Sequence, residues 1–195
     1  MRVIAGEAKG RTLVAPTGTG TRPATDRIRE TLFAILEPDL EGARVLDLFA
    51  GAGTLGIEAL SRGAAHVTFV ERSQAALTAL RANLRTTQFI ERADVIPANV
   101  LAYLQNRLAA GYDMVFCDPP FADVAVLEEV LAQLPIARAL LPSAIVIARV
   151  MRKHAPVVRE PARVYRTKEI GEESLLFLRY DAAAEEGDLG HPVPR

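Results

Sequence analysis

A chain of 195 residues is long enough to bury a sizeable core, and this length favours one main domain. Half of the residues are hydrophobic and the net charge is -1, but no apolar run approaches the ~18 residues of a membrane-spanning helix. The single cysteine, Cys117, excludes an internal disulfide, the histidines lack metal-ligand spacing, and the N-terminus lacks the apolar core of a signal peptide. We therefore expect a cytoplasmic protein without a membrane span or a metal site.

The N-terminal block predicts a small basic extension. Residues 2–5 and 11–14 are strand-like runs that flank a glycine-containing turn and indicate a β-hairpin, and residues 15–24 form a loop. Thr25 or Asp26 can cap a helix that runs to about Leu36. Residues 1–29 hold six Lys or Arg against two acids, a balance of +4, whereas residues 181–195 hold four acids against one Arg. The acidic end, rich in Gly and Pro, is expected to be a disordered tail.

From Arg44 onward, strand and helix patterns alternate along the chain. Strands are expected at 45–49, 67–70, 95–97, 113–117, 144–150, 164–168 and 175–180, and helices at 54–60, 74–86, 100–109 and 124–134. The last two strands flank Gly171 and form a hairpin. The pattern predicts an α/β fold with a mostly parallel seven-stranded sheet and an antiparallel C-terminal hairpin strand. We expect three parts: the extension at 1–24, the main domain at 25–180 and the tail at 181–195.

The stretch RVLDLFAGAGTLG, residues 44–56, is typical of a nucleotide-binding strand, glycine turn and helix. Read literally, G-x-G-x-x-G suggests a dinucleotide. Asp47 lies inside the strand end, where a carboxylate disfavours a pyrophosphate and favours a cation, so S-adenosylmethionine (AdoMet) fits better. Glu71 closes the next strand, where an acid can accept hydrogen bonds from both ribose hydroxyls of a nucleoside cofactor.

Asp118-Pro119-Pro120-Phe121 is the most specific motif in the chain. It follows an apolar strand, so Asp118 is expected at the carboxyl edge of the sheet, where open α/β sheets bind ligands. Asp118 and the Pro119 carbonyl can together accept both protons of an exocyclic amine, because the prolines fix the backbone and remove N–H donors. Phe121 offers a ring face for a planar base. The motif therefore predicts a site for an amine on a heterocycle.

These motifs, in this order, resemble a class I AdoMet-dependent methyltransferase of the amino-methylating group, with a Rossmann-like fold. MRVIAGEAKGRTLVAP, TRPATDRIRETLFAIL, LDLFAGAGTLGIEALSRGA and FCDPPF further resemble the bacterial RsmD-type enzymes over roughly residues 1–180. The resemblance implies transfer of a methyl group to N2 of a guanine in 16S rRNA within the small ribosomal subunit.

The resemblance also implies roles for individual residues. The residues that would line the AdoMet site are Asp47, Phe49, Gly51, Gly53, Leu55, Glu71 and Asn99. The target guanine would be held by Asp118, Pro119, Pro120 and Phe121. Beside that site, toward RNA and cofactor, would lie Arg22, Thr25, Asp26 and Arg29. Asn99 stands where an acid often contacts adenine, Arg149 where a glutamate is usual, and Ile170-Gly171 where the family has an aromatic residue and a glycine.

Other functions are compatible with parts of this pattern. A DNA adenine-N6 or small-molecule amine methyltransferase would share the central motifs, and a non-catalytic RNA-binding assembly factor could share the fold. A NAD-dependent oxidoreductase would need a catalytic His, Lys or Tyr set, and we find none that is convincing in the sequence. Cys117 could act as a nucleophile, although a free cysteine is more commonly a buried apolar residue.

Overall fold

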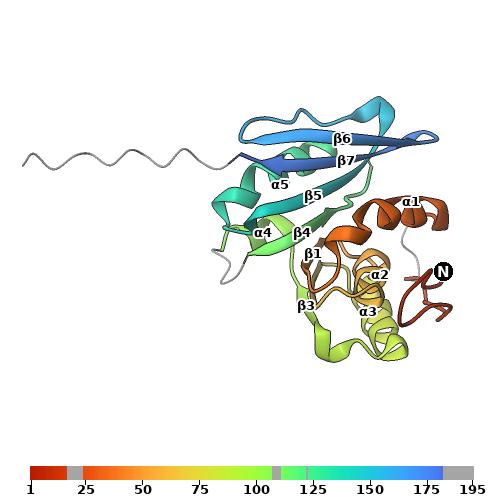
Figure 1. Cartoon of the computed structure of the whole chain (residues 1–195). Helices are drawn as coiled ribbons and strands as arrows, with labels where there is room; N and C mark the ends of the chain where they lie inside the picture. Colours follow the sequence, from red (N-terminus) through yellow and green to blue (C-terminus); the bar gives the residue numbers. More distant parts are fainter. Residues whose placement is uncertain (17–23, 107–110, 122, 182–195) are drawn as a thin grey trace, which may run out of the picture.

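The computed structural model describes residues 1–16, 24–106, 111–121 and 123–181, and its centre is a seven-stranded sheet between two layers of helices (Figure 1). The strands are β1 (Arg44–Leu48), β2 (His66–Glu71), β3 (Ala93–Pro97), β4 (Tyr112–Cys117), β5 (Leu140–Met151), β6 (Ala162–Ile170) and β7 (Glu173–Tyr180). The α-helices are α1 (Asp26–Leu36), α2 (Thr54–Ser61), α3 (Gln74–Thr87), α4 (Val100–Leu104) and α5 (Val124–Ile136). Short 3-10 helices cover Glu37–Asp39, Ile90–Arg92 and Arg152–His154.

The strand order across the sheet is β3-β2-β1-β4-β5-β7-β6. Strands β1 to β5 pair in parallel, whereas β7 runs antiparallel to both of its neighbours, β5 and β6. The chain leaves β1 toward β2 and β3 and then crosses to the other side at β4. In such sheets the crevice at this reversal, outside the carboxyl ends of the strands, is where ligands bind. This architecture confirms the predicted fold class.

The two layers of helices bury the two faces of the sheet. Side chains of α1, α2 and α3 pack on one face, where Phe116 of β4 and Phe177 of β7 belong to the same core cluster. Side chains of α4 and α5 pack on the other face against the alternate residues, such as Val115 and Leu178. Burial on both faces explains why β1, β2 and β4 have nearly continuous apolar sequences rather than alternating ones.

Three local features differ from the expected elements. The N-terminal residues form a tight turn with a single antiparallel bridge, between Arg2 and Thr12, instead of two full strands. Helix α4 ends at Leu104 rather than near residue 109, and residues 107–110 lie outside the described residues. Strand β5 begins at Leu140, before Pro142, because a register shift against β4 accommodates the irregular stretch.

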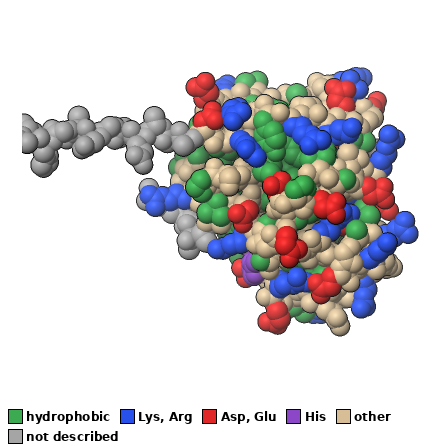
Figure 2. All heavy atoms as spheres, viewed as in Figure 1, with side chains coloured by type: hydrophobic (Ala, Val, Ile, Leu, Met, Phe, Trp, Pro, Cys, Tyr) green, Lys and Arg blue, Asp and Glu red, His purple; other side chains and the backbone are tan. Residues whose placement is uncertain are grey.

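The exterior carries charges of both signs. In Figure 2, viewed as in Figure 1, Lys and Arg side chains gather over the upper part of the visible face, where β6 and β7 lie. Each helix in the described ranges is too short or too polar to span a bilayer. The predicted acidic tail, residues 181–195, lies outside the described residues apart from Asp181.

Candidate active site

The glycine turn after β1 is held by two carboxylates from neighbouring strands. Asp47 in β1 is buried, and its Oδ2 accepts a hydrogen bond of 2.9 Å from the Gly56 N–H in the first turn of α2. Burial raises the pKa of Asp47 to about 8, the Gly56 bond opposes the rise, and the nearby charges of Asp118 and Glu71 add to it. Burial thus favours the protonated form of Asp47, and a cation beside it would favour the ionised form.

Glu71 ties the end of β2 to the same turn. Its Oε2 accepts a bond of 2.9 Å from the Gly51 N–H, and its Oε1 accepts bonds of 2.8 and 2.7 Å from the N–H groups of Arg72 and Ser73. A carboxylate has about four lone-pair sites, and these bonds use three of them. Glu71 can still accept a ligand hydroxyl, but its first role in this structure is to shape the turn.

The backbone of the turn leaves room for a ligand beside it. Phe49, Gly51 and Gly53 all have positive φ values, of +63°, +56° and +81°. Such a φ is uncommon for phenylalanine and is often found at functional sites. A Cβ on Gly53 would overlap Leu80, whereas a Cβ on Gly51 would meet no atom within 4 Å. Gly51 thus borders open space, with the carboxylate of Glu71 on one side of it.

Asn99 follows β3 at the same edge of the sheet. Its Oδ1 caps α4 by accepting bonds of 2.9 and 3.3 Å from the N–H groups of Leu101 and Ala102. Capping explains why an asparagine is suitable at this position, since its side chain satisfies donors that the helix leaves unpaired. A contact with an adenine amine stays a prediction.

Asp118 lies directly after β4, with its side chain 15% exposed. Its Oδ1 accepts a charged hydrogen bond of 2.7 Å from Arg149 Nε, and Arg149 Nη1 also donates to Glu173 Oε2 at 3.0 Å. The Arg149 guanidinium lies over the Phe121 ring, with its central carbon 4.7 Å from the ring centroid. Burial raises the pKa of Asp118, and the charge and hydrogen bond of Arg149 oppose that rise.

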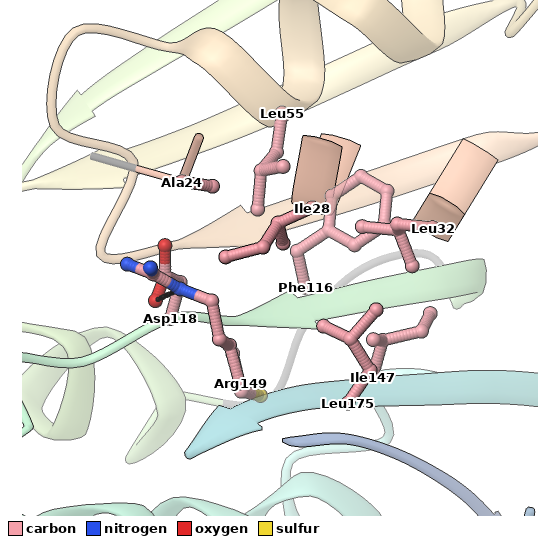
Figure 3. Close-up of a pocket in the computed structure, with 10 residues that line it drawn as sticks. Ala24, Ile28, Leu32, Leu55, Phe116, Asp118, Ile147, Arg149 and Leu175 are labelled. Carbon is pink, nitrogen blue, oxygen red and sulfur yellow. Dashed lines mark hydrogen bonds and ion pairs between the residues drawn. The ribbon is translucent and has the colours of Figure 1, made fainter. Parts of the chain in front are cut away.

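A small pocket separates this cluster from α1 and α2. Figure 3 shows Asp118 and Arg149 turned toward each other, with Ala24 and Leu55 facing them across the pocket. The pocket has a volume of about 10 Å³, room for about one water molecule, so a base cannot enter it in this arrangement. Leu55, predicted to line the cofactor site, lies 7% exposed in the wall of this pocket.

Of the residues predicted to face RNA, Thr25 and Asp26 lie at the start of α1. Thr25 caps the helix through a bond of 3.3 Å from the Ile28 N–H to its Oγ1. Asp26 is half exposed, and its pKa is lowered mainly by a hydrogen bond from Arg29 at 2.8 Å. Arg22 falls within residues 17–23, outside the described residues.

Arg29 does not fit the predicted contact with RNA. Its side chain is 1% exposed, and its guanidinium donates to Asp26 and to the Arg2 carbonyl, both at 2.8 Å. It also lies 3.6 Å from the buried carboxylate of Glu58 in α2. We assign Arg29 to the docking of the N-terminal residues on the core.

Cys117 is buried at the end of β4, and burial raises the pKa of its thiol. It therefore stays protonated, which disfavours the nucleophilic role considered from the sequence. In the described ranges, no group of three or more His, Cys, Asp or Glu side chains is arranged to hold a metal ion.

A family model described as "Conserved hypothetical protein 95" matches residues 1–179, nearly the whole chain. The chain belongs to this family, the RsmD family. The match includes the N-terminal turn, α1 and the glycine turn, as well as Asp118 and the C-terminal hairpin.

Individual relatives of this RsmD-family chain agree with the assignment. Ribosomal RNA small subunit methyltransferase D of Escherichia coli (strain K12) is 43% identical over 131 residues, 67% of this chain and 65% of that protein. YlbH of Bacillus subtilis (strain 168), described as an rRNA methyltransferase, is 43% identical over 125 residues, 63% of this chain and 68% of that protein. These alignments span about two thirds of the relatives' lengths. The solved structure of Escherichia coli yhhF, described as a methyltransferase, has 34% identity and a TM-score of 0.84, and the match covers 94% of this chain and 99% of that one.

Two features of this RsmD-family site were not predicted from the sequence. Arg149 was noted as a departure from the family pattern, but its contacts with Asp118, Glu173 and Phe121 depend on pairing between strands that are distant in the chain. Glu58 was not singled out, although it is the buried centre of the N-terminal docking site. The one available signal was an acid within the otherwise apolar helix sequence TLGIEALS.

Proposed function

We propose that this chain transfers a methyl group from AdoMet to N2 of a guanine in 16S rRNA of the small ribosomal subunit, in the cytoplasm. The relative named small subunit methyltransferase D supports the class of substrate. The observation that carries the proposal is the position of Asp118-Pro119-Pro120-Phe121, at the carboxyl end of β4 next to the glycine turn of β1. Cofactor and target amine would then meet where the strand order reverses.

The residues around the glycine turn fit AdoMet. Glu71 is oriented toward the turn and keeps a lone-pair site for a ribose hydroxyl, and Gly51 borders open space. Asp47 is a buried carboxyl group whose ionised form a cation would favour. When bound, AdoMet supplies an electrophilic methyl group on a sulfonium. Phe49, Gly53 and Leu55 would complete the walls of this cofactor site.

The residues after β4 would orient the amine for direct transfer. Asp118 and the Pro119 carbonyl accept hydrogen bonds from the two N–H groups of the amine, which favours a pyramidal nitrogen. The lone pair of this nitrogen can then form the new N–C bond as the S–C bond breaks. Pro120 stiffens the turn, and its carbonyl accepts a bond of 2.9 Å from the Asp123 N–H. Phe121 stacks on the base. Asp118, the carboxylate of this motif, can then accept the proton that the methylated nitrogen loses.

Arg149 occupies both groups that are proposed to contact the target base, the Asp118 carboxylate and the Phe121 ring. Its planar guanidinium donates to Asp118 and stacks on Phe121, so it must release Asp118 when a guanine arrives. Glu173, already 3.0 Å from Nη1, is a second acceptor that can retain the guanidinium after this release. Arg149 is thus a positioning residue whose charge and hydrogen bond oppose the rise in the pKa of Asp118 before the substrate binds.

The function is tested in cells by mass spectrometry of small-subunit rRNA nucleosides from a deletion strain. Loss of N2-methylguanosine, restored by the wild-type gene and not by an Asp118→Ala gene, is the expected result. Loss of N6-methyladenosine instead would favour the adenine methyltransferase, and an unchanged nucleoside profile would favour a non-catalytic assembly factor.

AdoMet affinity is expected to rise with pH between about pH 6 and pH 8, because the cation favours ionised Asp47, whose pKa without ligand is about 8. Below this pKa, binding releases a proton, so affinity increases by up to about tenfold per pH unit. Calorimetry would measure AdoMet affinity across this pH range. The Asp47→Asn variant keeps an acceptor for the Gly56 N–H but cannot ionise. Because AdoMet itself titrates in the same way with both proteins, the difference between their pH profiles reports on Asp47. Parallel pH profiles for the two proteins would contradict a charge role for Asp47.

The Arg149→Met variant is expected to transfer methyl groups poorly near neutral pH and to recover part of its rate at higher pH. Arg149 opposes the rise in the pKa of Asp118 that burial causes, so its loss raises that pKa further. Arg149→Lys keeps the charge and should shift the profile less. Single-turnover rates, measured across pH at saturating AdoMet, would refute this role if both variants kept the wild-type profile.

A further inference from the structure

The outermost strand of the sheet, β6, presents an uncovered face. Residues 163–169 of β6 are all exposed, and its only described partner strand is β7. Phe177 and Leu175 of β7 belong to the core cluster on the α1 side of the sheet, whereas Leu176 and Leu178 belong to the other cluster. Paired residues of neighbouring strands point to the same side, so the pairing assigns each β6 side chain to a face.

Five side chains share the α1 side of this hairpin. Arg163 pairs with Arg179, Arg166 with Phe177, and Lys168 with Leu175. The register shift between Val164 and Arg166 is a β-bulge, which places Tyr165 opposite Phe177 as well, with ring centroids 6.4 Å apart. We call this set the basic face: Arg163, Tyr165, Arg166, Lys168 and Arg179.

The basic face has a strong excess of positive charge. Arg163 is paired with Asp181 at 2.8 Å, but no described carboxylate lies within ion-pair distance of Arg166, Lys168 or Arg179. Two of these guanidinium groups lie over aromatic rings instead, Arg166 over Phe177 at 5.8 Å and Arg179 over Tyr165 at 5.0 Å. Charges on an edge strand can also prevent the strand from pairing with other proteins, but charges of either sign would do so, and this role does not explain an excess of positive charge.

The basic face is continuous with the candidate active site. Lys168 pairs with Leu175, and Leu175 pairs in turn with Arg149, whose guanidinium contacts Asp118. Neighbouring strands lie about 4.8 Å apart, so the backbones of Lys168 and Arg149 are separated by roughly 10 Å. From Lys168 to Arg163 the face extends along β6 by roughly 17 Å, at about 3.3 Å per residue. A nucleic-acid strand whose reactive base lies at Asp118 can therefore extend over this face.

We propose that the basic face binds the phosphate backbone of the RNA next to the target nucleotide, with Tyr165 stacking on an unpaired base. Tyr165 is 40% exposed and is held between Phe177 and Arg179, so its ring is already oriented. Cations without carboxylate partners release counterions when they contact phosphates, and this release supplies much of nucleic-acid affinity. This inference rests on the proposed function, because it requires that the substrate be RNA.

The test compares the Arg166→Gln/Lys168→Gln protein with wild type in binding to small ribosomal subunits from a strain that lacks the enzyme. Affinity is measured between about 50 and 200 mM salt. Loss of two phosphate contacts should lower affinity by roughly tenfold or more near 0.1 M salt and reduce the slope of log affinity against log salt by about 1.5. AdoMet affinity, measured by calorimetry, should stay as in wild type.

Two controls separate charge from structure. Arg81→Gln/Arg85→Gln makes the same change on the exposed side of α3 and should leave affinity and slope unchanged. Arg166→Lys/Lys168→Arg keeps the charges and should bind within about twofold of wild type; a loss as large as that of the Gln variant would overturn the proposal. Equal slopes for wild type and the Gln variant, with methyl transfer intact, would overturn this inference alone. A wild-type protein that binds AdoMet but no small subunits would overturn the proposed function as well.

Discussion

Asp118→Ala is expected to lower the single-turnover rate of methyl transfer by about 10²-fold or more while AdoMet affinity stays near that of wild type. The variant removes the carboxylate that would orient the amine, and an oriented interaction of ~3 kcal/mol in the transition state corresponds to this factor. Asp118→Asn keeps the shape but replaces one acceptor with an –NH₂ that confronts the amine, so its rate should also fall strongly. The measurement follows labelled methyl groups at saturating AdoMet and substrate.

A matched control lies at the other end of the same strand. Asp113 in β4 accepts a bond of 2.8 Å from the Arg44 N–H, far from the carboxyl edge. Asp113→Ala should keep the transfer rate within a few-fold of wild type, even if it is less stable. A folded Asp118→Ala protein with the wild-type rate would remove Asp118 from the mechanism.

Glu58→Ala is expected to lower the free energy of unfolding by about 3–5 kcal/mol, because it removes a buried carboxylate that faces Arg29 and accepts several hydrogen bonds. The Glu58 side chain has no exposed surface and accepts hydrogen bonds of 2.8 and 3.0 Å from the N–H groups of Ile4 and Ala5. It also accepts a bond of 2.8 Å from Arg62 and faces Arg29. Urea unfolding would measure the loss, and the N-terminal residues should become accessible to proteases.

Substitution of both partners distinguishes a buried ion pair from simple packing. Replacing both charges by apolar groups can be less costly than removing one, so Arg29→Met/Glu58→Met should recover the part of the loss that comes from Arg29. The N–H groups of Ile4 and Ala5 still lack their acceptor, so the recovery should be partial. Glu30→Ala, on the exposed side of α1, is the surface control and should change stability by less than about 0.5 kcal/mol. A loss below about 1 kcal/mol in Glu58→Ala would contradict the docking role of this residue.

The main elements of the fold could be predicted because local patterns coincide with the tertiary structure. The apolar runs of β1, β2 and β4 are strands buried on both faces. The acids near their carboxyl ends, Asp47, Glu71 and Asp118, mark the edge where the site lies. Expected boundaries were less accurate where tertiary contacts decide, as at α4, which ends at Leu104, and at β5, which begins at Leu140. A local pattern does not contain those contacts.

The burial of Arg29 and the position of Arg149 could not be predicted in the same way. Arginine is seldom buried unless it is paired. Arg29 pairs with nearby Asp26 but also lies beside Glu58, which is distant in sequence. Asp118, the partner of Arg149, is likewise distant in sequence. The sequence showed a basic balance in residues 1–29, and the family resemblance placed Arg22 and Arg29 toward RNA, but Arg29 is used internally. A count of charges therefore located the basic block without distinguishing surface cations from buried ones.

Transfer of labelled methyl groups from AdoMet to purified small subunits of a deletion strain, followed by identification of the labelled nucleoside, tests the central proposal most directly. Wild-type protein is expected to place the label in N2-methylguanosine, and Asp118→Ala is expected to place almost none. Label in a methylated adenosine, or no label from a wild-type protein that binds both AdoMet and the subunit, would contradict the proposal.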